Sequence, residues 1–216
     1  MKNTILLFIA GVLSASVCAQ QDPEAKKILD RVSEKTKAYT SIIADFELII
    51  NNRRDDMVTN SKGIIKVKGD KYYLESMDSE VYFDGKTMWT YMEDINEVTI
   101  SEPDTSEGDF IENPVKIFDF YNRDFKYHLV GEAKVDGIWM YEIDLFPKNL
   151  NQPYSRFKIF VDKETEHLYM ISAIAKDGVD YTAYIRNAKY NQNIDDSLFI
   201  FDPNRHDGIE IVDMRF

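Results

Sequence analysis

Four short turns divide this chain into hairpins, and they limit what it can fold into. Three contain Asp-Gly, at 84–85, 136–137 and 177–178, and the fourth is Gly69-Asp70. Asp-Gly and glycine-first pairs tolerate the positive φ angles that tight hairpin loops require. The segments between the turns alternate in polarity or are apolar, as strands do. The pattern therefore predicts an antiparallel β-meander of about eleven strands, with little helix.

Two helical segments interrupt this pattern. Asp22 is a capping residue and Pro23 suits a first helical position, so an amphipathic helix is expected over 23–38. Pro114 similarly opens a short apolar segment over 114–121 that is expected to be a helix. The apolar side chains of the two segments are Ile28, Leu29 and Val32, and Ile117, Phe118 and Phe120. Both helices are expected to lie on an apolar surface of the sheet.

The start of the chain has the layout of a secretory signal peptide. Lys2 supplies a positive charge, 5–12 is apolar, and Val17-Cys18-Ala19 is a small-residue end. We expect residues 1–19 to be removed near Ala19 on export to the periplasm, leaving 20–216 as a single domain. The alternative is a mature chain that begins at a lipidated Cys18, although Val17 is larger than a lipoprotein signal favours at that place.

Charge and cysteine content exclude several classes of function. The formal net charge is −12, and a surface this acidic disfavours nucleic acid and tight adsorption to anionic lipid headgroups. Cys18 is the only cysteine. If the chain is cut after Ala19, disulfides, thiol catalysis and cysteine-bound zinc are all excluded.

The sequence carries no strong sign of catalysis or of a cofactor. The three histidines, His128, His167 and His206, are far apart in sequence and lack the spacing of metal ligands. Nucleophile-elbow, phosphate-binding and dinucleotide motifs are absent. A glycosidase-like pair of Asp84 with Glu75 stays open, but Asp84 has a simpler role in its turn. We expect a protein that is not an enzyme and has no metal or cofactor.

The tight turns predict which side chains share a face of the sheet. Around Gly69-Asp70 one face holds Ile65, Val67, Tyr72 and Leu74. Around Asp136-Gly137 one face holds Trp139, Tyr141, Ile143, Leu145 and Val130. The pair around Asp84-Gly85 is apolar on both faces, with Val81, Phe83 and Met88 opposite Tyr82, Trp89 and Tyr91. A strand of that kind lies between two layers, for example between a cavity and a lid.

Aromatic residues make up 13% of the chain. They fit either an ordinary β-sandwich core or a concave sheet whose inner face exceeds what two short helices can fill. Composition does not separate these two interpretations.

The order of the elements resembles one family. After the first helix come Ala44-Asp45-Phe46, the hairpin around Gly69-Asp70, the stretch Asp-Gly-Lys-x-x-Trp-x-Tyr at 84–91, Asn113-Pro114 and the closing Phe-x-Phe-x-Pro at 199–203. This resembles the outer-membrane lipoprotein carrier family, the LolA-like periplasmic chaperones, over nearly all of the mature chain. The resemblance implies an unclosed barrel of eleven antiparallel strands under a helical lid. It implies no enzymatic activity and no cofactor.

The resemblance also implies a site and partners. The chain would carry the acyl chains of lipidated proteins, as a monomer, from an inner-membrane lipoprotein-releasing ABC complex to an outer-membrane acceptor. The alternative is a lipid-binding, acceptor or envelope-sensing protein of the same fold. The expected cavity residues are Phe46, Leu48, Ile65, Val67, Tyr72, Leu74, Trp89, Tyr91, Trp139, Tyr141, Ile143, Phe157 and Ile159. The expected lid residues are the six apolar side chains of the two helices. Gly69 stands where the best-known members have an arginine that hydrogen-bonds the lid shut, which puts such a latch in doubt here.

Overall fold

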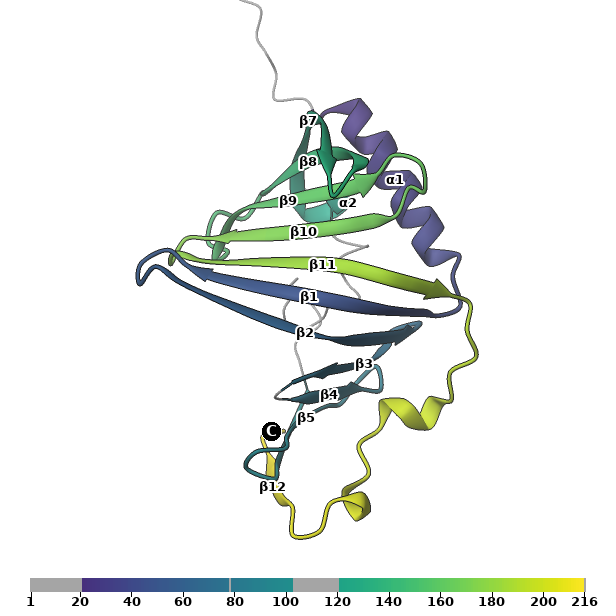
Figure 1. The fold of residues 1–216 in the computed structure, drawn as a ribbon, viewed down its shortest axis with the longest axis vertical. Helices are drawn as coiled ribbons and strands as arrows, with labels where there is room; N and C mark the ends of the chain where they lie inside the picture. Colours follow the sequence, from purple (N-terminus) through teal and green to yellow (C-terminus); the bar gives the residue numbers. More distant parts are fainter. Residues whose placement is uncertain (1–20, 78, 103–120, 216) are drawn as a thin grey trace, which may run out of the picture.

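The computed structural model describes residues 21–77, 79–102 and 121–215, and in them one large curved sheet dominates (Figure 1). The sheet has twelve strands in the order β12-β6-β5-β4-β3-β2-β1-β11-β10-β9-β8-β7. In chain order the strands are β1 (Ile42–Asn52), β2 (Met57–Lys68), β3 (Lys71–Ser76), β4 (Glu80–Phe83), β5 (Met88–Met92), β6 (Glu97–Ser101), β7 (Phe125–Val135), β8 (Ile138–Pro147), β9 (Tyr154–Asp162), β10 (Leu168–Ala175), β11 (Val179–Tyr190) and β12 (Glu210–Asp213). The helices are α1 (Pro23–Lys37) and the single turn α2 (Tyr121–Asp124), with two 3-10 turns, η2 (Asp196–Phe199) and η3 (Pro203–Arg205).

Helix α1 forms where the sequence predicts it. The Asp22 carboxylate accepts hydrogen bonds from the backbone N–H groups of Glu24 and Ala25, at 2.9 and 3.2 Å. The cap therefore satisfies donors that a helix start leaves without intrahelical partners. The second expected helix, over 114–121, lies outside the described residues except for Tyr121, which begins α2. Within the described residues no helix is both long and apolar enough to span a membrane.

All four predicted hairpins are confirmed. Gly69-Asp70 is a two-residue loop in which only Gly69 has a positive φ, of 58°, as a type II′ turn requires. Asp136 and Gly137 both have positive φ, of 49° and 83°, which suits a type I′ turn. The other two loops are longer, spanning 84–87 and 176–178. The turn role predicted for Asp84 is also confirmed, because its carboxylate accepts hydrogen bonds from the backbone N–H groups of Lys86 and Thr87.

A β-bulge in β7 overturns one predicted position. Leu129 pairs with Ile143 and Gly131 pairs with Glu142, so Val130 is an extra residue in the strand. The prediction that Val130 shares the face of Ile143 is therefore wrong. Val130 is 48% exposed, and Leu129 packs beside Ile143 instead. Assigning faces by counting outward from the turn assumes a regular strand, so it cannot reveal an inserted residue.

The sheet is open, and the predicted mainly β fold is confirmed. The two edge strands, β7 and β12, are not neighbours, and the twelfth strand is β12, which returns to pair in parallel with β6. Residues 21–22 cover part of the β7 edge, because Asp22 N–H donates to Tyr127 O at 3.4 Å and Leu129 N–H donates to Asp22 Oδ2 at 3.0 Å. Gly131 and the charged Glu132 and Lys134 follow on this strand, and bulges and charges are common ways to blunt an edge.

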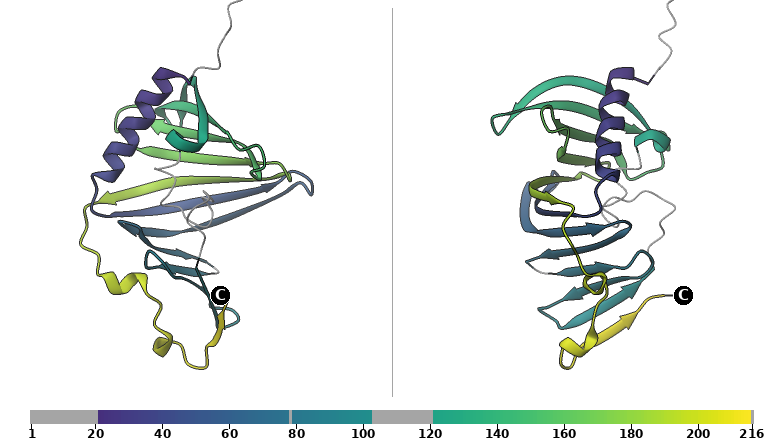
Figure 2. Two further views of the ribbon diagram at one scale, coloured as in Figure 1. Left: turned by 180° about the vertical axis from the view of Figure 1, so that it is seen from behind. Right: turned by 90° about the vertical axis from the view of Figure 1, so that its right-hand side faces the viewer.

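The two faces of the sheet are covered differently (Figure 2). Helix α1 crosses the concave face at the β7–β11 end. The chain after β11 runs past the β3–β6 end and reaches β12 through η2 and η3. Ile194 and Phe199 from this C-terminal segment (191–209) pack on Tyr73, whose side chain lies on the convex face.

Candidate functional site

The candidate site is the concave face of the sheet, defined as the face on which α1 lies. The strand register fixes its membership, because residues that pair across neighbouring strands point the same way. Phe46, for example, pairs with Ile185 on one side and with Gly63 on the other. Following the pairs from β7 to β5, the large side chains of this face include Tyr127, Leu129, Tyr141, Ile143, Leu145, Phe157, Ile159, Val161, Ile171, Tyr181, Ile185, Phe46, Leu48, Ile50, Ile65, Val67, Tyr72, Leu74, Val81, Phe83 and Met88.

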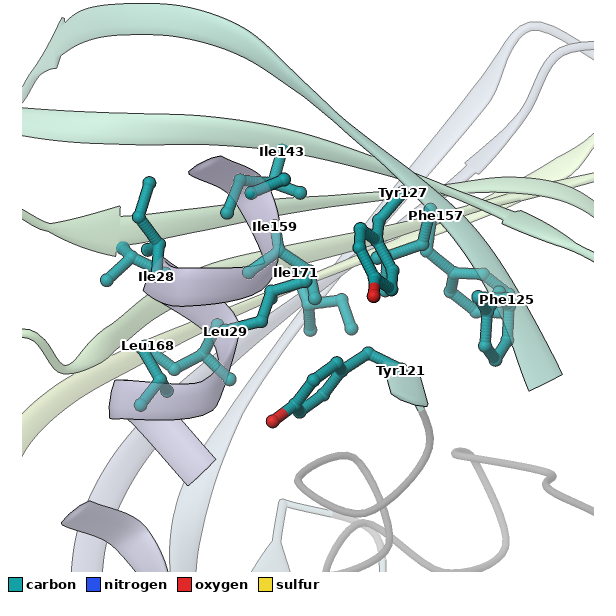
Figure 3. Packing of buried hydrophobic residues seen from close by; sticks show 14 of the residues in the cluster. Ile28, Leu29, Tyr121, Phe125, Tyr127, Ile143, Phe157, Ile159, Leu168 and Ile171 are labelled. Atoms are coloured by element: carbon teal, nitrogen blue, oxygen red, sulfur yellow. The ribbon is translucent and has the colours of Figure 1, made fainter. Parts of the chain in front are cut away.

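One half of the concave face is packed under α1, and we call it the covered half. Ile28, Leu29 and Val32 of the helix belong to one buried cluster with side chains of β7 to β10 (Figure 3). Ile143 and Phe157 are completely buried there. The predicted packing of the first helix on an apolar wall is confirmed.

The other half carries apolar side chains that are only partly covered, and we call it the open half. Phe46, Leu48, Ile65, Val67 and Leu74 are all half-buried. None of the five belongs to the cluster beneath α1, and neither α1 nor α2 packs on them among the described contacts. This half is therefore an apolar wall that the described helices leave largely bare.

The far end of the open half is better packed. Tyr72 and Phe83 are buried, with ring centroids 5.1 Å apart. The Tyr72 hydroxyl donates to Met88 Sδ at 3.4 Å, so even its polar atom is partnered within the apolar wall. The flexible thioether of methionine adapts to ligands of varied shape more readily than branched aliphatic side chains do.

Gly63 of β2 has no room for a side chain. A Cβ atom at this position would lie 1.9 Å from the backbone oxygen of Glu75 and 2.6 Å from two ring carbons of Phe46. Only glycine permits this approach. The Phe46 ring therefore lies directly against the β2 backbone, on the floor of the concave face.

The register brings eleven of the thirteen expected cavity residues to the concave face. Tyr141, Ile143, Phe157 and Ile159 lie in the covered half. Trp139 is on the same side of β8 but lies at the rim, with 56% of its surface exposed. The remaining residues of this group form the open half and its packed end: Phe46, Leu48, Ile65, Val67, Tyr72 and Leu74.

Trp89 and Tyr91 are placed on the convex face, and their assignment to the cavity is corrected. Trp89 pairs with Tyr82, whereas the concave-face residue Phe83 pairs with Met88. Both side chains pack with Phe201 of the C-terminal segment, and the Tyr91 and Phe201 ring centroids are 5.5 Å apart. The two-sided apolar pattern of this hairpin did indicate a second layer. That layer is the C-terminal segment, which packs against the convex face.

Other concave-face residues were missed by the expected site. The sequence predicts that one side of the hairpin around Asp84-Gly85 holds Val81, Phe83 and Met88. The pairs Tyr72–Phe83 and Leu74–Val81 join that side to the concave face. Chaining the two hairpins through these pairs would have identified them. Of the expected lid residues, Ile117, Phe118 and Phe120 lie outside the described residues.

Polar contacts hold the C-terminal end of α1 and the residues after it to the sheet. Arg31 Nε and Glu166 Oε1 are 2.6 Å apart, and Lys35 Nζ donates to the Thr165 carbonyl oxygen at 2.6 Å. Just after the helix, the Tyr39 hydroxyl lies 2.8 Å from His167 Nε2. The Tyr39 ring also stacks on Tyr190 with centroids 4.1 Å apart.

Burial shifts the pKa values of two groups in this anchor, His167 and Tyr190. Burial lowers the pKa of His167, the nearby positive charge of Lys35 lowers it further, and Asp162 opposes the shift. Burial raises the pKa of Tyr190 to about 12. The imidazole beside Tyr39 is therefore held neutral and can accept or donate a hydrogen bond there.

Gly69 takes no part in holding α1. It is exposed in its turn, and no atom lies within 4 Å of the position of an added Cβ. The residue that stands in the place of the family arginine thus has no side chain to hold the helix, and its turn is exposed. In this chain the anchor consists of Arg31, Lys35 and Tyr39.

The described residues offer no evident chemistry beyond apolar contact. No group of three or more histidine, cysteine, aspartate or glutamate residues among them could hold a metal ion. His128 lies 3.3 Å from Asp22 and His206 stacks on Phe201. Glu75 accepts a hydrogen bond from the Tyr73 hydroxyl, and Asp84 is bound within its own turn. A hollow of about 600 Å³ lies beside Trp139 at the rim, away from the open half.

Comparison with known proteins shows what this chain is similar to. A family model described as outer membrane lipoprotein carrier protein LolA matches residues 15–149, more than half of the chain. An uncharacterized protein from Methanocaldococcus jannaschii is 30% identical over 208 residues, covering 92% of this chain and 56% of that protein. The chain therefore spans little more than half the length of this relative.

Two solved structures are similar to this chain at low sequence identity. An uncharacterized conserved protein from Thermus thermophilus superposes with a TM-score of 0.58 at 13% identity, covering 88% of this chain and 99% of the other. A LolA superfamily protein from Nitrosomonas europaea superposes with a TM-score of 0.43 at 12% identity, covering 82% and 98% of the two chains. The first of these likenesses supports the fold alone.

Proposed function

Because this chain belongs to the family of outer membrane lipoprotein carrier proteins, LolA, we propose that it binds the acyl chains of lipidated proteins on its concave face and carries them between membranes. The single observation that supports this is the open half, where five large apolar side chains are half-buried on one continuous wall. A folded protein rarely leaves a contiguous apolar wall uncovered unless something binds there.

The energetics of the wall suit a carrier. Each methylene removed from water contributes about 0.8 kcal/mol, so an acyl chain gains strongly from an apolar wall of any detailed shape. Met88 at the end of the wall carries a flexible thioether, which favours binding without tight selectivity. No step of this process requires a catalytic residue, and the proposed role is not enzymatic.

The proposed setting is the periplasm. After removal of residues 1–19 the chain would act as one domain and as a monomer, with no cofactor. It would receive clients from the inner-membrane lipoprotein-releasing ABC complex and deliver them to an outer-membrane acceptor. Helix α1 and the apolar residues Ile117, Phe118 and Phe120 would form the lid over the bound chains.

Two neighbouring isoleucines provide a matched test of the site. Ile65 points to the concave face and Ile64 to the convex face, and both are half-buried on β2. Ile65→Asn should weaken binding of a fluorescent fatty acid at least tenfold, whereas Ile64→Asn should leave the Kd within about twofold, since one buried apolar side chain contributes roughly 1.5–3 kcal/mol. Equal effects of the two substitutions would contradict the proposed site.

A second measurement separates a lipoprotein carrier from a general lipid binder. The mature protein would be recovered from cell envelopes under mild conditions and analysed by native mass spectrometry. The expected result is a bound mass equal to an acylated polypeptide. A bound free lipid without polypeptide would instead favour the lipid-binding alternative.

A further inference from the structure

Phe46 occupies an unusual place in the concave face. It lies on β1, the seventh of the twelve strands in spatial order, and its ring crosses toward β2, the sixth. Its partner across β2 is Gly63, which leaves the space that the ring uses. The ring is thus at the middle of the sheet and is held low against the backbone.

The same position is the boundary between the two halves of the site. On one side Phe46 pairs with Ile185, which packs against the cluster under α1. On the other side its partner Gly63 pairs with Ser76 of β3, and Leu74 of the open half lies two residues before Ser76 on the same face. A chain that crosses the face along the row Gly63–Phe46–Ile185 therefore meets the Phe46 ring before it reaches the covered half.

The ring is supported from beneath but remains half-exposed above. Backbone atoms of β2 lie under it, so it cannot sink further into the sheet. Its half-buried state leaves part of the ring available to a ligand. Such a side chain can limit how far a ligand extends across the floor of the binding site.

On the basis of the proposed function, we propose that Phe46 is a specificity-determining residue. It limits the length of the acyl chain that the open half shelters. Gly63 acts with it as a positioning residue, because it sets the height of the ring. Removing the ring would leave its own volume free between the open half and Ile185.

This role of Phe46 can be tested by competition binding. Saturated fatty acids from decanoate to stearate would compete with a fluorescent fatty acid for the protein. For the wild-type protein, affinity should rise with chain length and then level off. In Phe46→Ala the levelling should move to longer chains, and stearate should gain about fourfold in affinity for each further methylene that is sheltered. Phe46→Leu, which keeps most of the apolar surface, should shift the profile in the same direction by less.

Phe146→Ala is the control, since Phe146 is an exposed phenylalanine on the opposite side of β8 from Leu145. Its profile should match the wild type. An unchanged length profile in both Phe46 variants, with binding retained, would overturn the role of Phe46 alone. Absence of saturable binding to the wild-type protein at every length would overturn the proposed function as well.

Discussion

At the scale of single residues, Gly63 is the position least able to accept a larger side chain. An added Cβ would lie 1.9 Å from a backbone oxygen, which cannot move aside as a flexible side chain could. Gly63→Ala should therefore lower the free energy of unfolding by about 1–3 kcal/mol, the cost of overpacking. Urea denaturation followed by circular dichroism would measure the change.

The control for this prediction is Gly69→Asn. Gly69 is exposed, nothing surrounds its Cβ position, and asparagine tolerates positive φ better than other residues. Its loss of stability should be the smaller of the two. A larger loss at Gly69 than at Gly63 would mean that backbone conformation, and not the close approach of β2 and β3, governs the glycines of this sheet.

His167 makes the attachment of the residues after α1 sensitive to pH. Its pKa is below the ordinary 6.5 in the folded protein, so the unfolded chain takes up the proton more readily. The stabilisation from neutral His167 is thus fully present above about pH 6.5 and declines as the pH falls toward the lowered folded pKa. The groups that face the imidazole are Tyr39, Lys35, Asp162 and the ring of Tyr190.

The expected result is a larger loss of thermal stability between pH 7.5 and 5.5 in the wild-type protein than in His167→Gln. Glutamine keeps a hydrogen-bonding group for Tyr39 but does not titrate. Carboxylates contribute to both proteins, so the difference between the two pH profiles isolates the histidine. Parallel profiles would show that protonation of His167 does not weaken this anchor.

At the scale of elements, the turns carried most of the information that sequence reasoning could use. Gly69-Asp70 and Asp136-Gly137 predicted both the hairpins and the faces around them, because a two-residue loop leaves one register. The bulge at Val130 was not predicted from the sequence, since its neighbours alternate as they would in a regular strand. Parallel strand β12 was not predicted either, because its pairing with β6 depends on a long return of the chain.

The C-terminal segment (191–209) is the element whose role the sequence concealed. Its apolar residues are irregularly spaced, so neither helical nor strand periodicity marks them, yet Phe201 is 5% exposed between Tyr82 and Tyr91. Phe201→Ala should cost about 3 kcal/mol of unfolding free energy, as truncation of a buried phenylalanine does. Denaturation in urea would measure this loss.

The same variant distinguishes the two faces of the sheet. Because Phe201 lies against the convex face, the folded Phe201→Ala protein should bind fluorescent fatty acid with a Kd close to that of the wild type. A substantial loss of binding in folded protein would indicate that the C-terminal segment shapes the site from behind, through β4 and β5.

At the scale of the whole molecule, the described residues cover the sheet unequally. One helix fills the covered half, whereas the open half exposes part of an apolar wall. The sequence predicted the wall and the helix separately from their periodicities. It could not show how far one helix reaches across twelve strands, because that depends on curvature and on where Arg31, Lys35 and Tyr39 attach.

If the open half binds an acyl chain as proposed, the stability of the protein should depend on this ligand. A ligand that covers the open half binds the folded state alone, so at a hundred times its Kd it should add about 2.7 kcal/mol of stability. For a chain of this size that corresponds to a rise in Tm of roughly 5–10 °C. Differential scanning fluorimetry with and without palmitate would show the rise in the wild type and in Ile64→Asn, and a much smaller rise at the same palmitate concentration in Ile65→Asn. If Ile65→Asn responded as fully as Ile64→Asn, the lipid would be covering some other surface, because the two side chains differ chiefly in the face of the sheet they occupy.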